Sequence, residues 1–117
     1  MERAHETLRE AETLKSGEMW HGCVCRLHHA CVFIVSAHLA SIDRPTTSMA
    51  GMILAVDELL VGQQLISAET GAVFQTLVEQ SHIADREDFV VLDATQIDLW
   101  ANQAAAFVGQ VETVTRR

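Results

Sequence analysis

The chain has 117 residues and a mass of 12.9 kDa, which is enough for one domain with its own hydrophobic core. Apolar residues make up 49% and charged residues 21%, a composition that excludes a disordered chain. With one Pro and six Gly there are too few turn residues for a β-sandwich or barrel, so residues 1–117 are predicted to form a single all-α domain. Eight Lys and Arg against sixteen Asp and Glu give a net charge of −8, which disfavours binding to duplex DNA or to an anionic membrane.

Hydrophobic periodicity predicts an antiparallel up-and-down bundle of four or five helices. The first helix covers residues 2–16, and Gly17 follows it as a stop signal. The second spans residues 18–42, ends before Pro45 and is apolar on almost every side. A helix of this kind lies at the centre of a bundle or at an oligomer interface. We therefore expect a homodimer that forms through the apolar surface of this helix.

The next two helices carry recognisable ends. Residues 48–61 are predicted to form the third helix, and Gly62 closes it. Its inward side chains are Met49, Met52, Ile53, Val56, Leu59 and Leu60. Ser67 is a good N-cap for the fourth helix, because a serine hydroxyl accepts a hydrogen bond from an unpaired N–H group of the first turn. Residues 85–88 are all charged and are predicted to break this helix.

The last helix follows a short apolar run, residues 89–92, whose pattern fits either a strand or a helix. Asp93 is the predicted N-cap, and Gln96 three residues later completes a start similar to a capping box. The inward side chains of this helix are Ile97, Trp100, Ala104, Phe107, Val111 and Val114. No internal repeat or long linker divides the chain, which supports a single domain.

Composition and order along the chain also predict its location. The first six residues are rich in charge and no apolar segment follows them, which is not the pattern of a signal peptide. The longest apolar run, residues 30–40, is far shorter than the roughly 20 residues that cross a bilayer. Cys23, Cys25 and Cys31 are odd in number and close together, which is typical of reduced thiols. We therefore expect a cytoplasmic protein without membrane contact.

Three segments carry a resemblance to a known family. Residues 3–41 read RAHETLREAETLKSGEMWHGCVCRLHHACVFIVSAHLAS, residues 65–71 read LISAETG with Phe74 beyond them, and residues 84–89 read ADREDF. In order and spacing these segments resemble the prokaryotic HEPN family. The opening helices of that family follow the pattern A…L..A..LL..G.Y..A..R.YYA.FHAA.ALL, and a later element reads alanine-aspartate-tyrosine-x-x-phenylalanine. The resemblance covers nearly the whole chain.

The resemblance implies an antiparallel helical bundle, often a homodimer, in a family that includes metal-independent ribonucleases. Many members act as toxins paired with a small nucleotidyltransferase antitoxin, and others have lost catalysis and bind RNA or a nucleotide. The nuclease members use an arginine followed four to six residues later by a histidine, a spacing that no arginine has here. The family's arginine in the fourth helix corresponds to Ser81, and the tyrosine of its later element corresponds to Arg86.

These departures predict a HEPN-like module with a degenerate ribonuclease motif and no cofactor. It would bind RNA, a nucleotide or a nucleotidyltransferase partner. The residues predicted to contact a ligand are Arg26, His29, Ser81, Asp85 and Arg86.

An active metal-independent ribonuclease is the first alternative. Arg26 matches the arginine in the family's second helix, and His28 and His29 occupy the positions of its aromatic pair. Arg26 and His29 are three residues apart, so on a helix they share a face and could bind one phosphate. A histidine can act as acid or base in attack by a ribose 2′-hydroxyl, and His82 lies next to the altered position in the fourth helix. The plainer interpretation pairs Arg26 with an acidic residue and packs the histidines inside the bundle.

A metal-binding bundle is the second alternative. His21, Cys25 and either His28 or His29 are spaced i, i+4 and i+7 or i+8, which places them on one face of a helix. Imidazole and thiolate are the ligands that zinc and similar transition metals prefer. Because the chain has no Cys-x-x-Cys pair, a symmetric dimer would have to supply the missing ligands.

Overall fold

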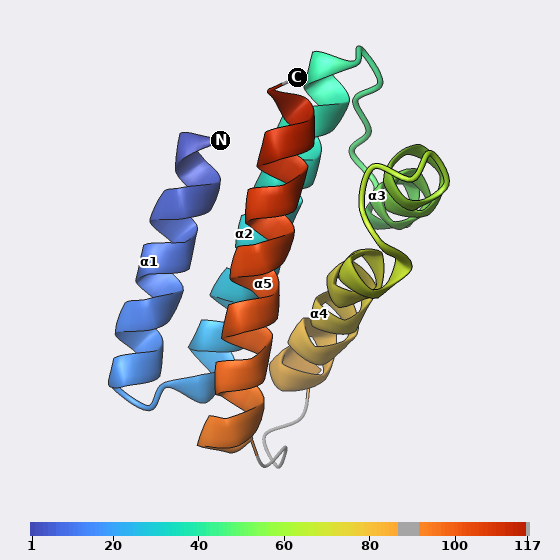
Figure 1. Ribbon diagram of the computed structural model, residues 1–117. Coiled ribbons are helices and arrows are strands. Elements are labelled where there is room, and N and C mark those ends of the chain that lie inside the picture. The colour runs from blue at the N-terminus through green and yellow to red at the C-terminus, as the bar shows by residue number, and fades with distance from the viewer. Residues whose placement is uncertain (87–91, 117) are drawn as a thin grey trace.

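The computed structural model describes the backbone of residues 1–86 and 92–116, and the side chains of these residues except 84–86. In this part of the chain every regular element is a helix (Figure 1), which confirms the all-α bundle predicted from the sequence. The elements are α1 (Glu2–Ser16), α2 (Trp20–Ser41), α3 (Met49–Ala55), the π-helical segment η1 (Val56–Val61), α4 (Ala68–Arg86) and α5 (Ala94–Thr115).

Helix α2 is the centre of the bundle. It packs against α1, α5 and α4, and α1 runs antiparallel to it (Figure 1). Helix α5 runs in the same direction as α2, because α4 returns the chain to the end at which α2 begins. The side chains of α2 buried by these neighbours are Cys23, Val24, Leu27, His28, Ala30, Cys31, Ile34, Val35, His38 and Leu39. The central position predicted for this helix is therefore confirmed.

The burial of α2 also bears on the predicted homodimer. The apolar surface from which a dimer was expected is covered by the chain's own helices. Its composition is explained by packing within one chain, and the homodimer stays a prediction. Among the described helices, α2 alone is long and apolar enough to cross a membrane, but 56% of its most apolar stretch is buried inside the bundle. The core helix of a globular domain has the same properties.

The two N-caps predicted from the sequence, Ser67 and Asp93, are confirmed, and Ser48, predicted as the first residue of its helix, is a third N-cap. Ser48 Oγ accepts a hydrogen bond from Gly51 N at 2.9 Å at the start of α3. At the start of α4, Ser67 Oγ accepts one from Thr70 N at 3.1 Å. Asp93 Oδ1 does the same for Gln96 N at 2.9 Å at the start of α5. These bonds occupy N–H groups that the first helical turn leaves without a backbone partner.

The turn between α1 and α2 has its left-handed residue at Glu18, one position after the predicted stop at Gly17. Gly17 ends α1 as expected, but its φ is −88°, and the left-handed residue is Glu18 with φ of 57°. Because a left-handed residue cannot continue a right-handed helix, α2 starts at Trp20, two residues later than predicted.

The third predicted helix changes its geometry at Val56. Residues 49–55 are α-helical, whereas residues 56–61 form a π-helix in which N–H groups bond to the fifth preceding carbonyl, as Gly62 N does to Asp57 O at 2.7 Å. The π-helical turn lies at the point where Gly71 of α4 comes close to Val61. A Cβ atom on Gly71 would lie 2.3 Å from Cγ2 of Val61, so only glycine fits there.

Helix α4 continues to Arg86 and therefore through the first half of the predicted polar break. The second half, residues 87–88, lies outside the described residues. The same holds for most of the apolar run over 89–92 and for Phe89 of the HEPN-like element.

Candidate functional site

Three histidines meet where α2 packs against α4. The ring centroid of His28 lies 5.5 Å from that of His29 and 6.5 Å from that of His82. His28 is buried, with 7% of its surface exposed, whereas the other two side chains are exposed. The structure thus brings together three of the four predicted catalytic candidates, from helices more than fifty residues apart in sequence. We call His28, His29 and His82 the histidine cluster.

Ser81 and Cys25 lie in the same helix interface. The Ser81 hydroxyl donates a hydrogen bond to Cys25 Sγ at 3.7 Å, and the serine side chain is 3% exposed. This bond joins α4 to α2 beside the histidine cluster, so the hydroxyl faces the neighbouring helix and not the solvent. Asp85 and Arg86, the other ligand-binding candidates of α4, belong to its last turn, and their side chains lie outside the described part of the chain.

Arg26 points toward α1. Its Nε atom lies 3.5 Å from Oε2 of Glu10, and the two side chains are 46% and 54% exposed. A shallow hollow of about 310 Å³, lined by Glu10, Thr13, Leu14 and Arg26, surrounds this pair. The plainer interpretation of Arg26, pairing with an acidic residue, agrees with this geometry. The guanidinium is engaged with α1, whereas the histidine cluster faces α4.

The predicted metal ligands do not gather into a cluster. His21 and Cys25 are partly exposed on α2. Within the described residues, no three His, Cys, Asp or Glu side chains lie close enough together to hold one metal ion. None of the three cysteines forms a disulfide. Burial raises the pKa of Cys23 to about 11 and raises the pKa of Cys31 further, so at neutral pH both are thiols and not the thiolates that bind metals.

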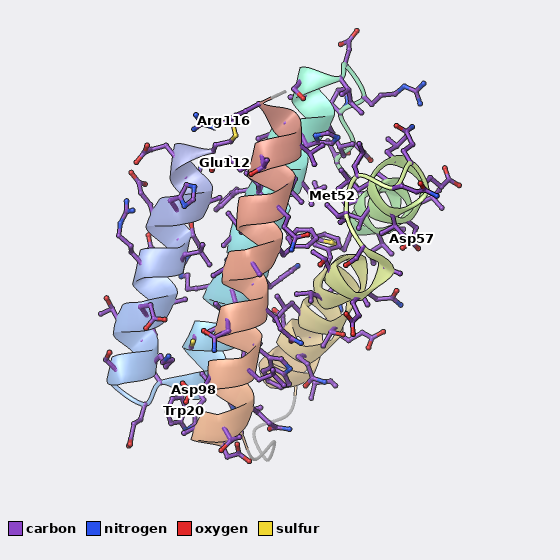
Figure 2. The ribbon with its side chains drawn as sticks, viewed as in Figure 1. Trp20, Met52, Asp57, Asp98, Glu112 and Arg116 are labelled. Carbon is purple, nitrogen blue, oxygen red and sulfur yellow. The ribbon has the colours of Figure 1, made fainter. Side chains whose placement is uncertain are left out.

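Two ion pairs that sequence analysis missed join α1 to α5. His5 Nε2 contacts Glu112 Oε2 near the C-terminal end of α5, and Lys15 Nζ lies 3.0 Å from Asp98 Oδ1 near the other end (Figure 2). The hydrogen bond that Lys15 donates to Asp98 raises the pKa of Lys15, and the one that Glu112 accepts from His5 lowers the pKa of Glu112. The partners are 83 or more residues apart in sequence, so no local pattern could have revealed them.

A second buried histidine, His38, lies away from the histidine cluster. His38, near the end of α2, is 4% exposed, and its Nδ1 lies 2.9 Å from Oγ1 of Thr115 at the end of α5. Burial lowers the pKa of this imidazole. Thr115 also donates to the carbonyl of Val111, so its hydroxyl ties the imidazole to the last turn of α5.

No protein-family model matches the chain, and no curated protein matches it either. The HEPN resemblance therefore depends on the order and spacing of this chain's own residues.

Proposed function

We propose that the chain is a HEPN-like helical module that binds RNA or a nucleotide without cleaving it, and that the histidine cluster holds a phosphate. The observation that carries the proposal is the meeting of His28 and His29 of α2 with His82 of α4. The exposed imidazoles of His29 and His82 can each offer an N–H donor to phosphate oxygens, whereas both ring nitrogens of His28 are buried. The resemblance places the family's site at the same two helices.

The proposal excludes cleavage for two reasons. The arginine–histidine spacing of the family's nucleases is missing from the sequence. Arg26, the candidate to replace that arginine, is paired with Glu10 on α1. RNA transesterification needs a cation to stabilise the charge that develops on the phosphorus oxygens, besides an acid and a base. Imidazoles alone supply binding and proton transfer without that fixed charge.

The charge of the chain limits the ligand to a short one. Affinity for a long nucleic acid comes from many phosphate contacts by clustered Lys and Arg. With a net charge of −8, this chain can offer only a local contact. A nucleotide or a few residues of single-stranded RNA fit that limit, and the affinity would depend weakly on salt.

Fluorescence anisotropy tests the proposal, with a labelled ten-nucleotide single-stranded RNA and, in competition, ATP. The double variant His29→Gln/His82→Gln is expected to raise the Kd at least tenfold, since each lost bond to a charged phosphate is worth about 1.5 kcal/mol or more. His21→Gln is the matched control, because it removes an imidazole from the same helix about 10 Å along the axis from His28. Equal affinities for the wild type and the double variant would overturn the proposal.

An active ribonuclease is the second candidate function. The exposed imidazoles of His29 and His82 both lie near His28 and offer an acid and a base for transesterification, with Arg26 as the candidate cation. The family resemblance also implies a nucleotidyltransferase partner and a cytoplasmic toxin–antitoxin setting for either candidate. Co-purification of such an enzyme with the tagged chain tests that part of the proposal.

A further inference from the structure

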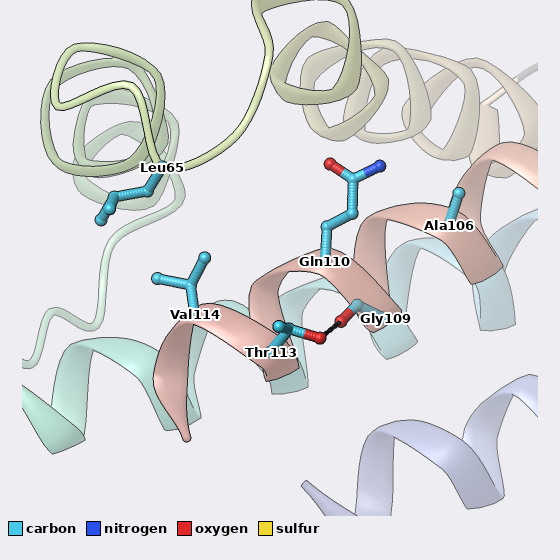
Figure 3. A pocket seen from close by; sticks show the side chains of 6 residues that line it. All are labelled: Leu65, Ala106, Gly109, Gln110, Thr113 and Val114. Carbon is cyan, nitrogen blue, oxygen red and sulfur yellow. Dashed lines mark hydrogen bonds between the residues drawn. The ribbon is translucent and has the colours of Figure 1, made fainter. Parts of the chain in front are cut away.

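A second surface feature lies at the other end of α4. A groove of about 500 Å³ runs between the outward face of α5 and the segment that follows η1 (Figure 3). Its lining residues are Leu65, Ala106, Gly109, Gln110, Thr113 and Val114. It shares Leu65 and Gln110 with a hollow of about 530 Å³ toward Val61, and Ala106 with one of about 270 Å³ toward Glu69. We call this continuous surface the α5 groove.

Within the described part of the chain, no contact requires glycine at position 109. Gly109 lies inside α5, its φ is not positive, and a Cβ atom added to it would meet no atom within 4 Å. Glycine in a helix interior is less stable than alanine, so this position gives up helix stability without an internal reason. Together with Ala106 it leaves the α5 wall low enough for another helix backbone to approach closely.

The charges around the groove have one sign. None of the eight Lys and Arg falls within residues 45–85 or 87–115, the stretches from which both walls are built. One acidic side chain, Glu69, lines one end of the groove, whereas the carboxylate of Glu112 on α5 is paired with His5 of α1 and does not line it. Arg116, which follows α5, is bound by Glu112 with Nε 3.3 Å from Oε1.

We propose that the α5 groove is the docking site for an amphipathic helix of a partner protein, with an apolar stripe flanked by lysines and arginines. The apolar stripe would pack on Leu65 and Val114, and the cations would face Glu69 and meet no lysine or arginine from either wall. A second copy of this chain does not fit, because a chain with a net charge of −8 offers no cationic amphipathic helix and α1 itself carries more acidic than basic residues.

The proposal is independent of the proposed function. The groove meets α4 at its beginning, whereas His82 is fourteen residues beyond Ala68, about 20 Å along the helix axis. Substitutions at the groove therefore leave the histidine cluster unchanged.

The probe is a synthetic eighteen-residue helical peptide with leucines at i, i+3, i+4 and i+7 spacing and lysines beside them, titrated by calorimetry. The control peptides carry glutamate in place of lysine, or the same residues in scrambled order. Wild-type protein is expected to bind the lysine peptide with a micromolar Kd and to show no binding of either control peptide. Its affinity for the lysine peptide should fall at least threefold between 50 and 300 mM NaCl. Absence of binding, or equal binding of the glutamate peptide, would overturn the proposal.

Gly109→Leu is the variant that fills the groove, and Gly109→Ala is its matched control. Because nothing lies near Cβ, both variants should fold with a melting temperature at or above that of the wild type. Gly109→Leu is expected to raise the Kd for the lysine peptide at least tenfold, whereas Gly109→Ala should raise it less than twofold. Unchanged binding by Gly109→Leu would place the peptide elsewhere. A wild-type dimer that Gly109→Leu converts to a monomer would show that a second copy occupies the groove, and would also overturn the proposal.

Discussion

At the scale of single residues, burial of ionisable groups sets how the chain responds to pH. His38 is buried and its pKa lies below the ordinary value of 6.5, so the unfolded chain binds a proton there more readily than the folded one. The free energy of unfolding is then largest above pH 6.5 and falls as the pH drops through that value toward the folded pKa.

We therefore expect the melting temperature of the wild type to fall between pH 7.5 and pH 5.5. His38→Gln removes the titrating group and retains a side chain that can form a hydrogen bond with Thr115. The melting temperature of the variant should therefore fall less over the same pH interval. Circular dichroism melts of both proteins at three pH values make the comparison. Glu112 does not obscure it, because its lowered pKa affects stability only when the pH falls through the acid range near and below 4.5. Parallel pH profiles for the two proteins would contradict this account of His38.

Burial also separates the three thiols. Cys23 and Cys31 are fully buried and have raised pKa values, whereas Cys25 is partly exposed. A thiol reagent such as DTNB should therefore modify one cysteine rapidly in the folded protein and all three in denaturant. Cys25→Ser should abolish the rapid phase. Rapid reaction of two or three thiols in the folded wild type would show that α2 is less well covered than described.

At the scale of the helices, two glycines differ in the space around them, so their replacement by alanine should have opposite effects on stability. Gly71 lies where α4 approaches η1, and a Cβ atom there would overlap Val61; around Gly109 there is open space. Gly71→Ala should lower the free energy of unfolding by about 1–3 kcal/mol because the helices must move apart.

Gly109→Ala should raise the free energy of unfolding by up to about 1 kcal/mol through helix propensity alone. Urea denaturation of both variants beside the wild type tests the pair. Destabilisation by Gly109→Ala would mean that the face of α5 around Gly109 is packed more tightly than the structure has it.

The helix scale also shows which features the sequence could predict. The N-caps Ser48, Ser67 and Asp93 were predictable because a capping hydrogen bond joins residues two or three positions apart. The π-helical turn at Val56 was not, because it accompanies the close packing of α4 from a later part of the chain.

At the scale of the whole molecule, the bundle brings together side chains whose proximity the sequence could only suggest. The sequence offered His82 only as a candidate next to the altered position in the fourth helix, and the structure brings its ring centroid to 6.5 Å from that of His28. The partner of Arg26 was predictable in kind but not in identity, because Glu10 reaches it only once α1 folds back on α2. The pairs between α1 and α5 required the complete fold.

The charge distribution belongs to the same scale. Apart from Arg86, the cations lie in the first 44 residues and at the C-terminal end, and the stretches 45–85 and 87–115 carry acidic charge only. A cationic partner that contacts these stretches would meet no lysine or arginine there, and the histidine cluster depends on imidazoles more than on fixed cations for any phosphate contact. The two proposed sites differ in chemistry as well as in position.

We propose that the histidine cluster binds RNA without cleaving it. The most direct measurement incubates the purified protein with single-stranded RNA in EDTA and follows chain length by gel and binding by anisotropy in the same samples. The account predicts intact RNA, measurable binding by the wild type and by Arg26→Ala, and lost binding by His29→Gln/His82→Gln. RNA cleavage in EDTA that disappears in the double histidine variant would contradict it and would identify the chain as a metal-independent ribonuclease.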